Sequence, residues 1–500
     1  MADTIQFPKS VGQIALIEEL GLKIPPPAIR SKVTSSARKT VTSDGITTEY
    51  YPKTYLAQGV YANLKFAMRY EPVDLRVMNA AFSSIDAKLL AEEIGRERTG
   101  KFARRIWYLY ELLTGKRLEL PDAPRTGYVD LLNKKLQYVA KPRPARRQWV
   151  NDNLPGNRLY CPMIRRTEML EAYANQNLDE RARQLVRTCD PHIIARAVNY
   201  LFTKETRSSF AIEGEEVSND RAQRFVAALG RAAEFDTSSK DQFIKLQNSI
   251  ISDPRYAASD YRDRQNFVGQ TMSDYSQHIH FIFPKPEDVG ELMNGWMNCL
   301  RDIEQAAMDP IAVAAIAAFG FVFVHPFEDG NGRIHRFLVH HVLSKLNFTP
   351  DNILFPVSAV MLRDLGTYNR VLEKYSSSVN GLIDYDFNAD QTITVNGTTA
   401  HLYRYWDATE FAEYLYACIA ETIDKDLKEE LGFLEIFDRA LRATMGIVDM
   451  PDQPASLMVR MILQNNGKLS KAKRDKFAEL TDDEVLAIES AISAVSGRGD

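Results

Sequence analysis

Hydrophobic side chains recur every three or four residues along most of the chain. Because this spacing places apolar residues on one face of a helix, it predicts amphipathic helices. The pattern covers three stretches, which are 74–118, 159–346 and the segment after about residue 426, where 455–463 and 482–495 are clearest. The fold class is therefore predicted to be mainly α, with a helical N-terminal region, a helical core and a small C-terminal helical segment.

Three stretches depart from the helical pattern. Residues 275–283 alternate between polar and apolar side chains and stop at Pro284, which predicts a strand or one arm of a hairpin. Residues 386–400 predict a hairpin inserted between helices, with Asn396-Gly397 as its turn. Residues 141–157 are rich in Pro, Arg and Asn, and this composition predicts a linker.

Composition narrows the class of protein. The 500 residues are 45% hydrophobic and 26% charged, as in ordinary globular domains. The four cysteines form no CxxC pair, and the first residues lack the basic and apolar regions of a signal peptide. The longest apolar run, 311–324, has 14 residues, fewer than the ~20 that span a bilayer. A cytoplasmic protein without a membrane segment is predicted.

Charge is unevenly distributed along the chain. Residues 1–150 hold 25 Lys and Arg against 15 Asp and Glu, whereas the remaining 350 hold 37 against 51. Most of the basic excess lies in 101–150, with 12 basic and 4 acidic residues. Such a stretch is either a solvated helical face or a surface for nucleic acid or an acidic partner. The function of residues 1–150 is left open.

The stretch with the clearest chemistry is HPFEDGNGRIHR, residues 325–336. An apolar helix leads into it, and Pro326 makes the chain turn. Gly330 and Gly332 then flank Asn331, and a new helix follows. A glycine-rich turn that opens a helix presents backbone N–H groups and the positive end of the helix dipole, so it predicts an anion site.

Charged side chains beside this turn suit chemistry on a phosphate ester. Arg333 and Arg336 are three residues apart, share a helix face and are able to clamp phosphate oxygens. Asp329 is placed to hold Mg²⁺ between phosphates. His325 suits a general base that acts on a substrate hydroxyl. Together these residues predict a site for attack on a phosphate.

The stretch resembles the signature of the Fic family, HPFx[D/E]GNGRxxR, and matches it at every defined position. The resemblance implies a protein adenylyltransferase with an all-α core, which transfers AMP from ATP to a Tyr, Thr or Ser hydroxyl of a target protein and releases diphosphate. His325 would deprotonate that hydroxyl, which would then attack the α-phosphate. Phe327 would anchor the loop in the core.

The resemblance also implies how ATP is held. Asp329 would bind Mg²⁺, Asn331 and the amides of Gly330 and Gly332 would hold phosphates, and Arg333 and Arg336 would position the β- and γ-phosphates. Residues 262–284 resemble the family's flap, which would pair with a target segment by β-augmentation. Four flap residues would line the nucleotide pocket, namely Asn266, Phe267, Val268 and Gly269. Tyr368 would close its adenine end.

A second motif, SFAIEG at 209–214, resembles the [S/T]xxxE[G/N] inhibitory motif of some Fic proteins, with Ser209, Glu213 and Gly214 at its defined positions. The resemblance implies that Glu213 pairs with Arg336 and so removes the guanidinium that the γ-phosphate needs. The expected domains are then a basic region at 1–150, a Fic domain at 159–425 and a helical segment at 426–500.

Three alternatives to this interpretation each meet a sequence feature that argues against them. The first alternative is transfer of a phosphoryl group. Relatives with that activity carry lysine at the position of Gly332, so the glycine argues against it. Residues 95–101 have the spacing of a Walker motif, but Phe102 replaces the magnesium-binding hydroxyl. A nucleic-acid-binding regulator would explain the basic N-terminal region, but not an intact His325 and Asp329. The expected partners are ATP and a target protein, with a homo-oligomer and nucleic acid at 101–147 left open.

Overall fold

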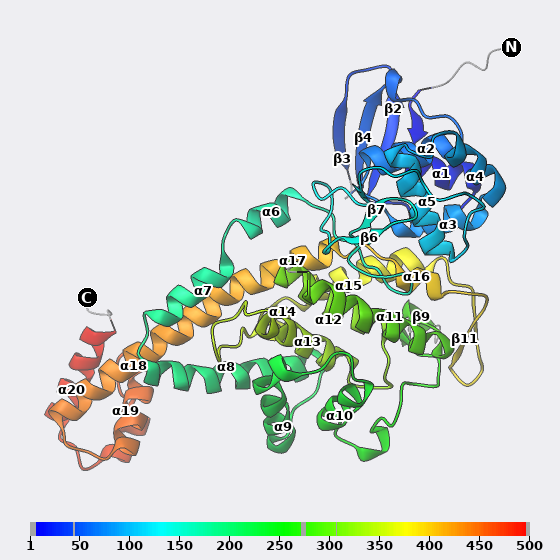
Figure 1. The fold of residues 1–500 in the computed structure, drawn as a ribbon. Coiled ribbons are helices and arrows are strands. Elements are labelled where there is room, and N and C mark those ends of the chain that lie inside the picture. Colours follow the sequence, from blue (N-terminus) through cyan, green and yellow to red (C-terminus); the bar gives the residue numbers. More distant parts are fainter. Residues whose placement is uncertain (1–6, 44–45, 272–276, 307, 497–500) are drawn as a thin grey trace. The chain divides into compact units, whose positions relative to one another are not determined.

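The computed structural model describes residues 7–43, 46–271, 277–306 and 308–496. Its elements are mostly helices, which confirms the predicted fold class (Figure 1). The chain divides into two compact units. One contains residues 1–176, 206–348 and 361–418, and the other contains 177–205, 349–360 and 419–500.

The N-terminal part of the first unit combines helices with a four-stranded sheet. The helices are α1 (Gln13–Leu20), α2 (Val60–Tyr70), α3 (Leu75–Ser84), α4 (Ala87–Arg96) and α5 (Lys101–Thr114). The sheet has the order β1 (Lys9–Val11), β2 (Ile29–Thr34), β4 (Ile46–Pro52) and β3 (Lys39–Ser43). The prediction of helices alone was incomplete here. In β3 all five residues are exposed, so no alternation of apolar residues marks the strand.

The predicted linker at 141–157 contains two strands. β6 (Arg143–Ala145) and β5 (Val129–Asp130) pair with the two sides of β7 (Val150–Asp152). The linker prediction was therefore wrong for these residues. Strands of two or three residues carry no readable period, and here pairing between the three short segments defines them.

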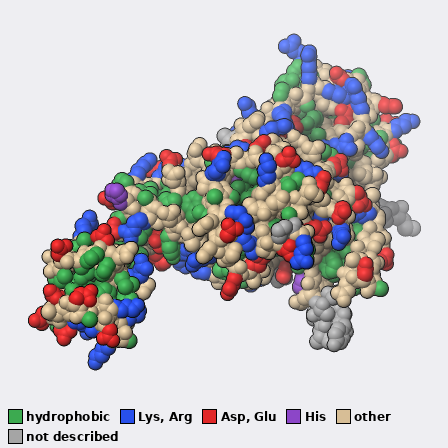
Figure 2. Space-filling model, turned by 90° about the horizontal axis from the view of Figure 1, so that it is seen from below, with side chains coloured by type: hydrophobic (Ala, Val, Ile, Leu, Met, Phe, Trp, Pro, Cys, Tyr) green, Lys and Arg blue, Asp and Glu red, His purple; other side chains and the backbone are tan. Residues whose placement is uncertain are grey.

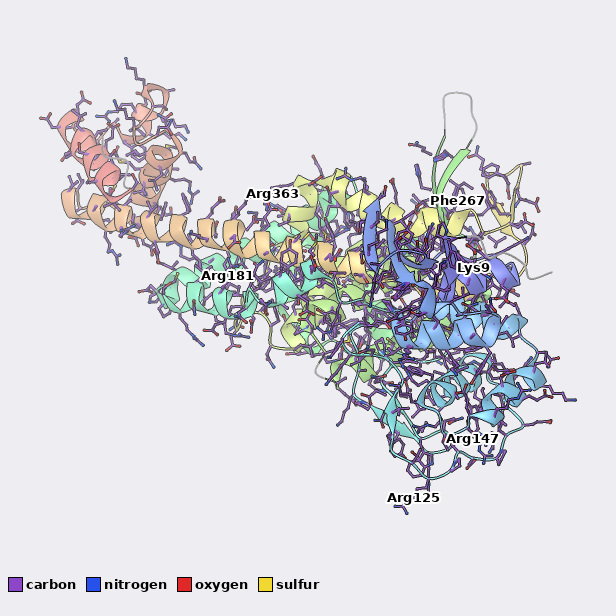
Figure 3. All side chains as sticks on the ribbon, turned by 90° about the horizontal axis from the view of Figure 1, so that it is seen from above. Lys9, Arg125, Arg147, Arg181, Phe267 and Arg363 are labelled. Atoms are coloured by element: carbon purple, nitrogen blue, oxygen red, sulfur yellow. The ribbon has the colours of Figure 1, made fainter. Side chains whose placement is uncertain are left out.

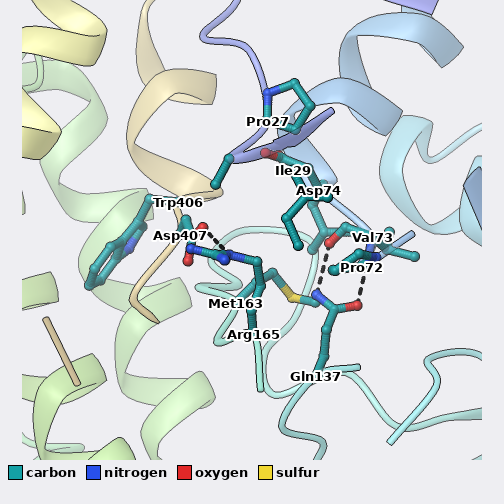
Figure 4. Close-up of a pocket in the computed structure, with 12 residues that line it drawn as sticks. Pro27, Ile29, Pro72, Val73, Asp74, Gln137, Met163, Arg165, Trp406 and Asp407 are labelled. Carbon is teal, nitrogen blue, oxygen red and sulfur yellow. Dashed lines mark hydrogen bonds and ion pairs between the residues drawn. The ribbon is translucent and has the colours of Figure 1, made fainter. Parts of the chain in front are cut away.

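The chain that follows β7 runs alongside residues 404–408 of the first unit. The Met163 amide donates to the Trp406 carbonyl over 2.9 Å, and Arg165 Nε lies 2.8 Å from Asp407 Oδ2. Nearby, the Gln137 side chain bonds both backbone groups of Val73 (Figure 4). The cavity between these residues has a volume of about 20 Å³, room for about one water molecule, so it is no nucleotide site.

A buried helix, α12 (Pro310–Val324), forms the centre of the helical core. Nearly all of its residues are buried, as expected for a helix that is apolar all round. Around it pack α13 (Asn331–Lys345) and α11 (Pro286–Glu304). The other helices of this unit are α6 (Glu168–Ala174), α9 (Asn219–Gly230), α10 (Lys240–Ile250), α15 (Leu365–Asn380), α16 (Ala400–Arg404) and α17 (Thr409–Glu421), which ends beyond residue 418.

Two hairpins interrupt the helices. β8 (Phe267–Thr271) pairs with β9 (Gln277–Ile282), which confirms the predicted hairpin arm within the described residues; 275–276 lie outside them. β10 (Tyr385–Phe387) pairs with β11 (Ile393–Val395). The predicted turn at Asn396-Gly397 was wrong, because the chain turns at 388–392. There the Asn388 side chain bonds the Thr392 hydroxyl over 2.8 Å.

The second unit is helical. It contains α7 (Leu178–Arg187), part of α8 (Pro191–Ile212) and of α14 (Val357–Arg363), a π-helical turn (Thr422–Leu427), α18 (Lys428–Ile447), α19 (Asp452–Gln464) and α20 (Asp482–Val495). The helices predicted at 455–463 and 482–495 are thus confirmed. Buried side chains of α18, α19 and α20 form their own hydrophobic core.

The apolar character of the helices and the charge of the surface both bear on function. Among the helices of the described residues, none combines the length and the apolar character that crossing a membrane requires. On the face shown in Figure 2, acidic and basic side chains are interspersed. On this face, any excess of one sign of charge is therefore confined to small clusters of side chains.

Candidate functional site

His325 directly follows α12 and caps its C-terminal end. Its N–H donates to the Phe321 carbonyl over 2.9 Å, and its backbone is left-handed, with φ 51° and ψ 61°. Pro326 cannot continue the helix, so the chain turns away at this point. The half-buried imidazole stacks on Phe283, with ring centroids 3.8 Å apart, and Nδ1 lies 3.4 Å from the Val322 carbonyl oxygen.

The imidazole of His325 is held in its neutral form. Burial lowers its pKa to about 3, and the nearby Arg262 guanidinium lowers it further. A neutral imidazole has a lone pair that is able to accept a proton, which is the form that a general base requires.

Arg262 positions this histidine, and the sequence analysis missed it. Its Nε donates to the His325 carbonyl over 2.8 Å, and Nη2 donates to the Pro284 carbonyl over 2.6 Å. Its backbone N–H also donates to the Pro326 carbonyl over 2.8 Å. The side chain thus ties the loop after α12 to the base of the β8–β9 hairpin. In the sequence it is one of three charged residues in a row, and no local pattern distinguishes it.

The loop 327–331 is closed by its own side chains. Asn331 Oδ1 accepts from the Phe327 N–H over 3.0 Å, and Nδ2 donates to the Phe327 carbonyl over 2.7 Å. Phe327 is fully buried. The Asn331 side chain therefore shapes the loop in this structure, and its role in holding phosphates stays a prediction.

The start of α13 is the predicted anion site. Gly330, with φ 89°, precedes the first helical residue, and among the described residues no side chain caps this end of the helix. The first N–H groups of a helix have no partner within it, so they are available to an anion. Asp329 accepts from the Gly330 N–H over 2.5 Å and keeps about half of its side chain exposed.

Arg333 is buried and held by two carboxylates. Nη2 lies 2.7 Å from Asp329 Oδ1, and Nη1 lies 3.0 Å from Glu215 Oε1. Glu215 also pairs with Arg221 over 2.7 Å. Nothing in the sequence distinguishes Glu215 from its neighbour Glu216, and only the fold reveals its contact with Arg333.

Arg336 is buried against the end of α8. Its Nη2 lies 2.6 Å from Glu213 Oε1 and donates to the Ser209 carbonyl over 2.7 Å, while Nε donates to the Ser209 hydroxyl over 2.8 Å. The Glu213 carboxylate also covers Gly332, since a Cβ atom at that position would lie 2.2 Å from Glu213 Oε1. Gly214, with φ 72°, takes the chain out of the helix.

A cavity of about 400 Å³ opens beside these residues. Five residues predicted for the site line it, namely Glu213, Val268, His325, Gly332 and Tyr368. Its apolar walls include Phe281, Phe283 and Leu372. Tyr368 is 4% exposed; burial raises the pKa of its hydroxyl, and the nearby Arg336 guanidinium lowers it.

The other predicted flap residues do not line this cavity. Asn266 uses its side-chain oxygen to accept from the Phe267 N–H over 2.9 Å. Phe267, labelled in Figure 3, packs its ring against Phe387 of the second hairpin, at 6.3 Å between centroids. Gly269 lies close to the His278 backbone, where a Cβ atom would be 2.9 Å from its carbonyl oxygen. Of the four predicted flap residues, Val268 is the one in the cavity wall.

Asp329 is the candidate ligand for a magnesium ion. Within the described residues, no group of three or more His, Cys, Asp or Glu side chains could hold a metal by itself. The half-exposed carboxylate beside an uncapped helix start fits a cation that takes its remaining ligands from phosphates and water.

Comparisons with known proteins agree on the family. The model of the Fic/DOC family matches residues 237–343. The protein adenylyltransferase fic-1 of Caenorhabditis briggsae is 30% identical over 210 residues, which cover 37% of this chain and 39% of that protein. The protein adenylyltransferase Fic of Nematostella vectensis is 32% identical over 116 residues, covering 23% and 25%.

Among solved structures, that of a Fic family protein from Desulfovibrio desulfuricans G20 is similar to this chain. The match covers 56% of this chain and 80% of that protein's chain, with 17% identity and a TM-score of 0.38. The chain spans less than half the length of the curated relatives it matches. The matched segment 237–343 contains the whole 325–336 signature. Residues 237–343, with the signature inside them, are therefore similar to the Fic/DOC family.

Proposed function

We propose that this chain is a protein adenylyltransferase, which transfers AMP from ATP to a Tyr, Thr or Ser hydroxyl of a target protein. One observation carries the proposal: a neutral imidazole, His325, stands in the wall of a cavity beside the uncapped start of α13. The helix start suits phosphate, and the imidazole suits removal of a proton from an incoming hydroxyl.

In the proposed reaction, His325 takes the proton of the target hydroxyl. The hydroxyl oxygen then forms a bond to the α-phosphorus of ATP, the bond to the bridging oxygen breaks, and diphosphate leaves. Arg333 and Arg336 would hold the distal phosphates. Asp329 would hold Mg²⁺, which neutralises phosphate charge and aligns the phosphates when bound.

The proposal includes binding of the target at the β8–β9 hairpin. Among the strands that the structure describes, β8 pairs with β9 alone, so the outer edge of β8 is one that a peptide could extend. The hairpin is firmly held at its base, where Asn380 bonds the His280 carbonyl over 2.5 Å and the Tyr403 hydroxyl donates to the Ile282 carbonyl over 2.7 Å. Because this hairpin is already held in place, less conformational entropy is lost when a peptide binds to it.

We also propose that Glu213 inhibits the enzyme. Its contact with Arg336 occupies a guanidinium that the γ-phosphate would need. Gly332 stands where relatives that transfer a phosphoryl group carry lysine, which argues against that alternative. A cytoplasmic location and self-association stay predictions.

The test of the proposed activity compares the wild type with His325→Ala. Both proteins are incubated with ATP and Mg²⁺, and self-labelling is followed with ATP labelled at the α-phosphate. Loss of the general base should slow labelling by about 10²- to 10⁴-fold. Binding of ATP, measured by calorimetry, should stay within about twofold, since the imidazole acts on the hydroxyl. Labelling of the variant at the wild-type rate would contradict the proposal.

A further inference from the structure

A second hollow lies in the N-terminal part of the chain, distant in sequence from the Fic signature. It is formed by the end of α2, the start of α5 and residues 129–135, and its volume is about 520 Å³. Its lining contains a single carboxylate, that of Asp130, and five basic side chains, which are Arg69, Lys101, Arg105, Lys134 and Lys135. This excess of positive charge indicates a site for an anionic ligand.

Four of these cations have no carboxylate partner among the described residues, namely Arg69, Lys101, Lys134 and Lys135, and all four are exposed. Other basic residues of 101–147 are used within the fold. Arg147, labelled in Figure 3, pairs with Glu111 and Asp122, and Arg143 pairs with Asp152. The basic excess of this region is therefore partly structural, and a distinct set of unpaired charges lines the hollow.

Arg105 adds a buried charge to the same wall. It is 7% exposed, and its Nε and Nη1 donate to the carbonyls of Leu131 and Met68 over 2.6 and 2.7 Å. Asp130 lies near enough to favour its charged form, but Asp130 also accepts from Asn151 over 2.9 Å. A buried cation that is held by carbonyls stays poorly compensated, so an anion in the hollow would stabilise it.

Aromatic rings stand among these cations. Lys101 Nζ lies 4.8 Å from the centroid of the Phe102 ring, and Arg69 Cζ lies 4.9 Å from that of Tyr70. Both rings line the hollow and are half-buried. Cations that track phosphates, together with aromatic rings that stack on bases, are the combination that binds single strands. An acidic polypeptide would use the charges but not the rings.

We propose that this hollow binds single-stranded nucleic acid. Phosphates contact the four unpaired cations, and an unstacked base packs against Phe102 and Tyr70. A duplex meets the exposed lysines alone, because its bases are paired and stacked. This binding is separate from the proposed transfer of AMP, and its failure would leave that proposal unchanged.

The test uses the full chain and a labelled single-stranded DNA of about 16 nucleotides, followed by fluorescence anisotropy. Each neutralised phosphate of a single strand contributes about 0.7 to the slope of log affinity against log salt, so four contacts predict a slope of about −3. Affinity should then fall about 50-fold between ~50 and ~200 mM salt. A duplex of the same sequence and polyglutamate are the competitors.

Two variants locate the site. Lys101→Ala/Lys134→Ala/Lys135→Ala removes three exposed charges and should weaken binding at low salt at least about tenfold. The matched control, Lys468→Ala/Lys471→Ala/Lys473→Ala, removes three exposed lysines of the second unit and should bind as the wild type does. Phe102→Leu keeps an apolar side chain and should weaken binding of the single strand about tenfold, with binding of polyglutamate unchanged.

Four results would overturn the proposal. Two concern the variants: undiminished affinity of the triple lysine variant for the single strand, or an equal loss of affinity in the control variant. The other two concern the competitors: polyglutamate that competes as strongly as the single strand, or a duplex that binds as tightly as the single strand. Circular dichroism of each variant checks that the fold is kept, so that a loss of binding reports on the hollow.

Discussion

Replacing Glu213 with glycine should release the enzyme from inhibition. The substitution removes the carboxylate that lies 2.6 Å from Arg336, while Ser209 keeps its two contacts with the guanidinium. Glu213 follows the last residue of α8, so glycine at this position does not interrupt the helix. The freed guanidinium then has a hydrogen-bonding position for the γ-phosphate.

The size of the effect follows from the geometry. A displacement of a reacting group by ~1 Å costs about 100-fold in rate, so the variant should transfer AMP at least about tenfold and up to about 100-fold faster. It should also be less stable without nucleotide. Breaking a fully buried ion pair costs ~3–5 kcal/mol. Because the Glu213 side chain is 35% exposed, we expect about 1–2 kcal/mol here.

Two assays check these expectations. Initial rates of labelling from α-labelled ATP measure the gain in activity. Thermal unfolding with and without ATP and Mg²⁺ measures stability: the midpoint of the variant should fall by a few degrees without nucleotide and recover when ATP fills the vacated position. Glu216→Gly is the matched control, since it removes an exposed glutamate three residues away.

A Glu213→Gly variant that binds ATP but shows no gain in rate would contradict inhibition by Glu213. Activity of the double variant Glu213→Gly/Arg336→Ala would contradict it too, because the guanidinium that the carboxylate is argued to block would then be dispensable.

The remaining predictions concern neighbouring side chains. Glu215→Gln should weaken the hold on Arg333 and, in the Glu213→Gly background, raise the affinity for ATP a few-fold by calorimetry. Arg262→Lys should lower kcat at least about tenfold with KM for ATP nearly unchanged, because the fork that positions His325 is lost. Asp329→Ala should abolish the dependence of ATP affinity on Mg²⁺. The folded pKa of His325 is depressed, so its contribution to stability is present above ~6.5, the pKa of an unfolded histidine, and is lost as pH falls toward 3. The rate of labelling should stay level between about pH 6 and 8. A fall in that rate with an apparent pKa near 6.5 would contradict the burial of the imidazole.

The catalytic loop could be predicted from the sequence because its parts are neighbours in the chain. Pro326, Gly330 and the helix that follows determine a turn and a helix start by local rules. The contact between Glu213 and Arg336 joins residues 123 positions apart, and only the resemblance to a known motif suggested it.

Other parts of the site could not be predicted, for a physical reason. Arg262 and Glu215 are charged residues next to other charged residues, and their roles arise when the fold brings partners to them. Arg262 meets the His325 carbonyl across 63 positions. Asn331 has both side-chain groups bonded within its loop, which spacing alone does not reveal. Within the N-terminal sheet, β3 is exposed throughout, so no alternation of apolar residues marks it.

The central claim is that the transferred group is AMP. The most direct measurement incubates Glu213→Gly with Mg²⁺ and ATP that is labelled at either the α- or the γ-phosphate, and then counts label that stays on protein after denaturation. The account predicts retention of the α-label, release of the γ-label as diphosphate, and loss of both signals in Glu213→Gly/His325→Ala. Retention of the γ-label, or α-labelling that survives the removal of His325, would contradict it.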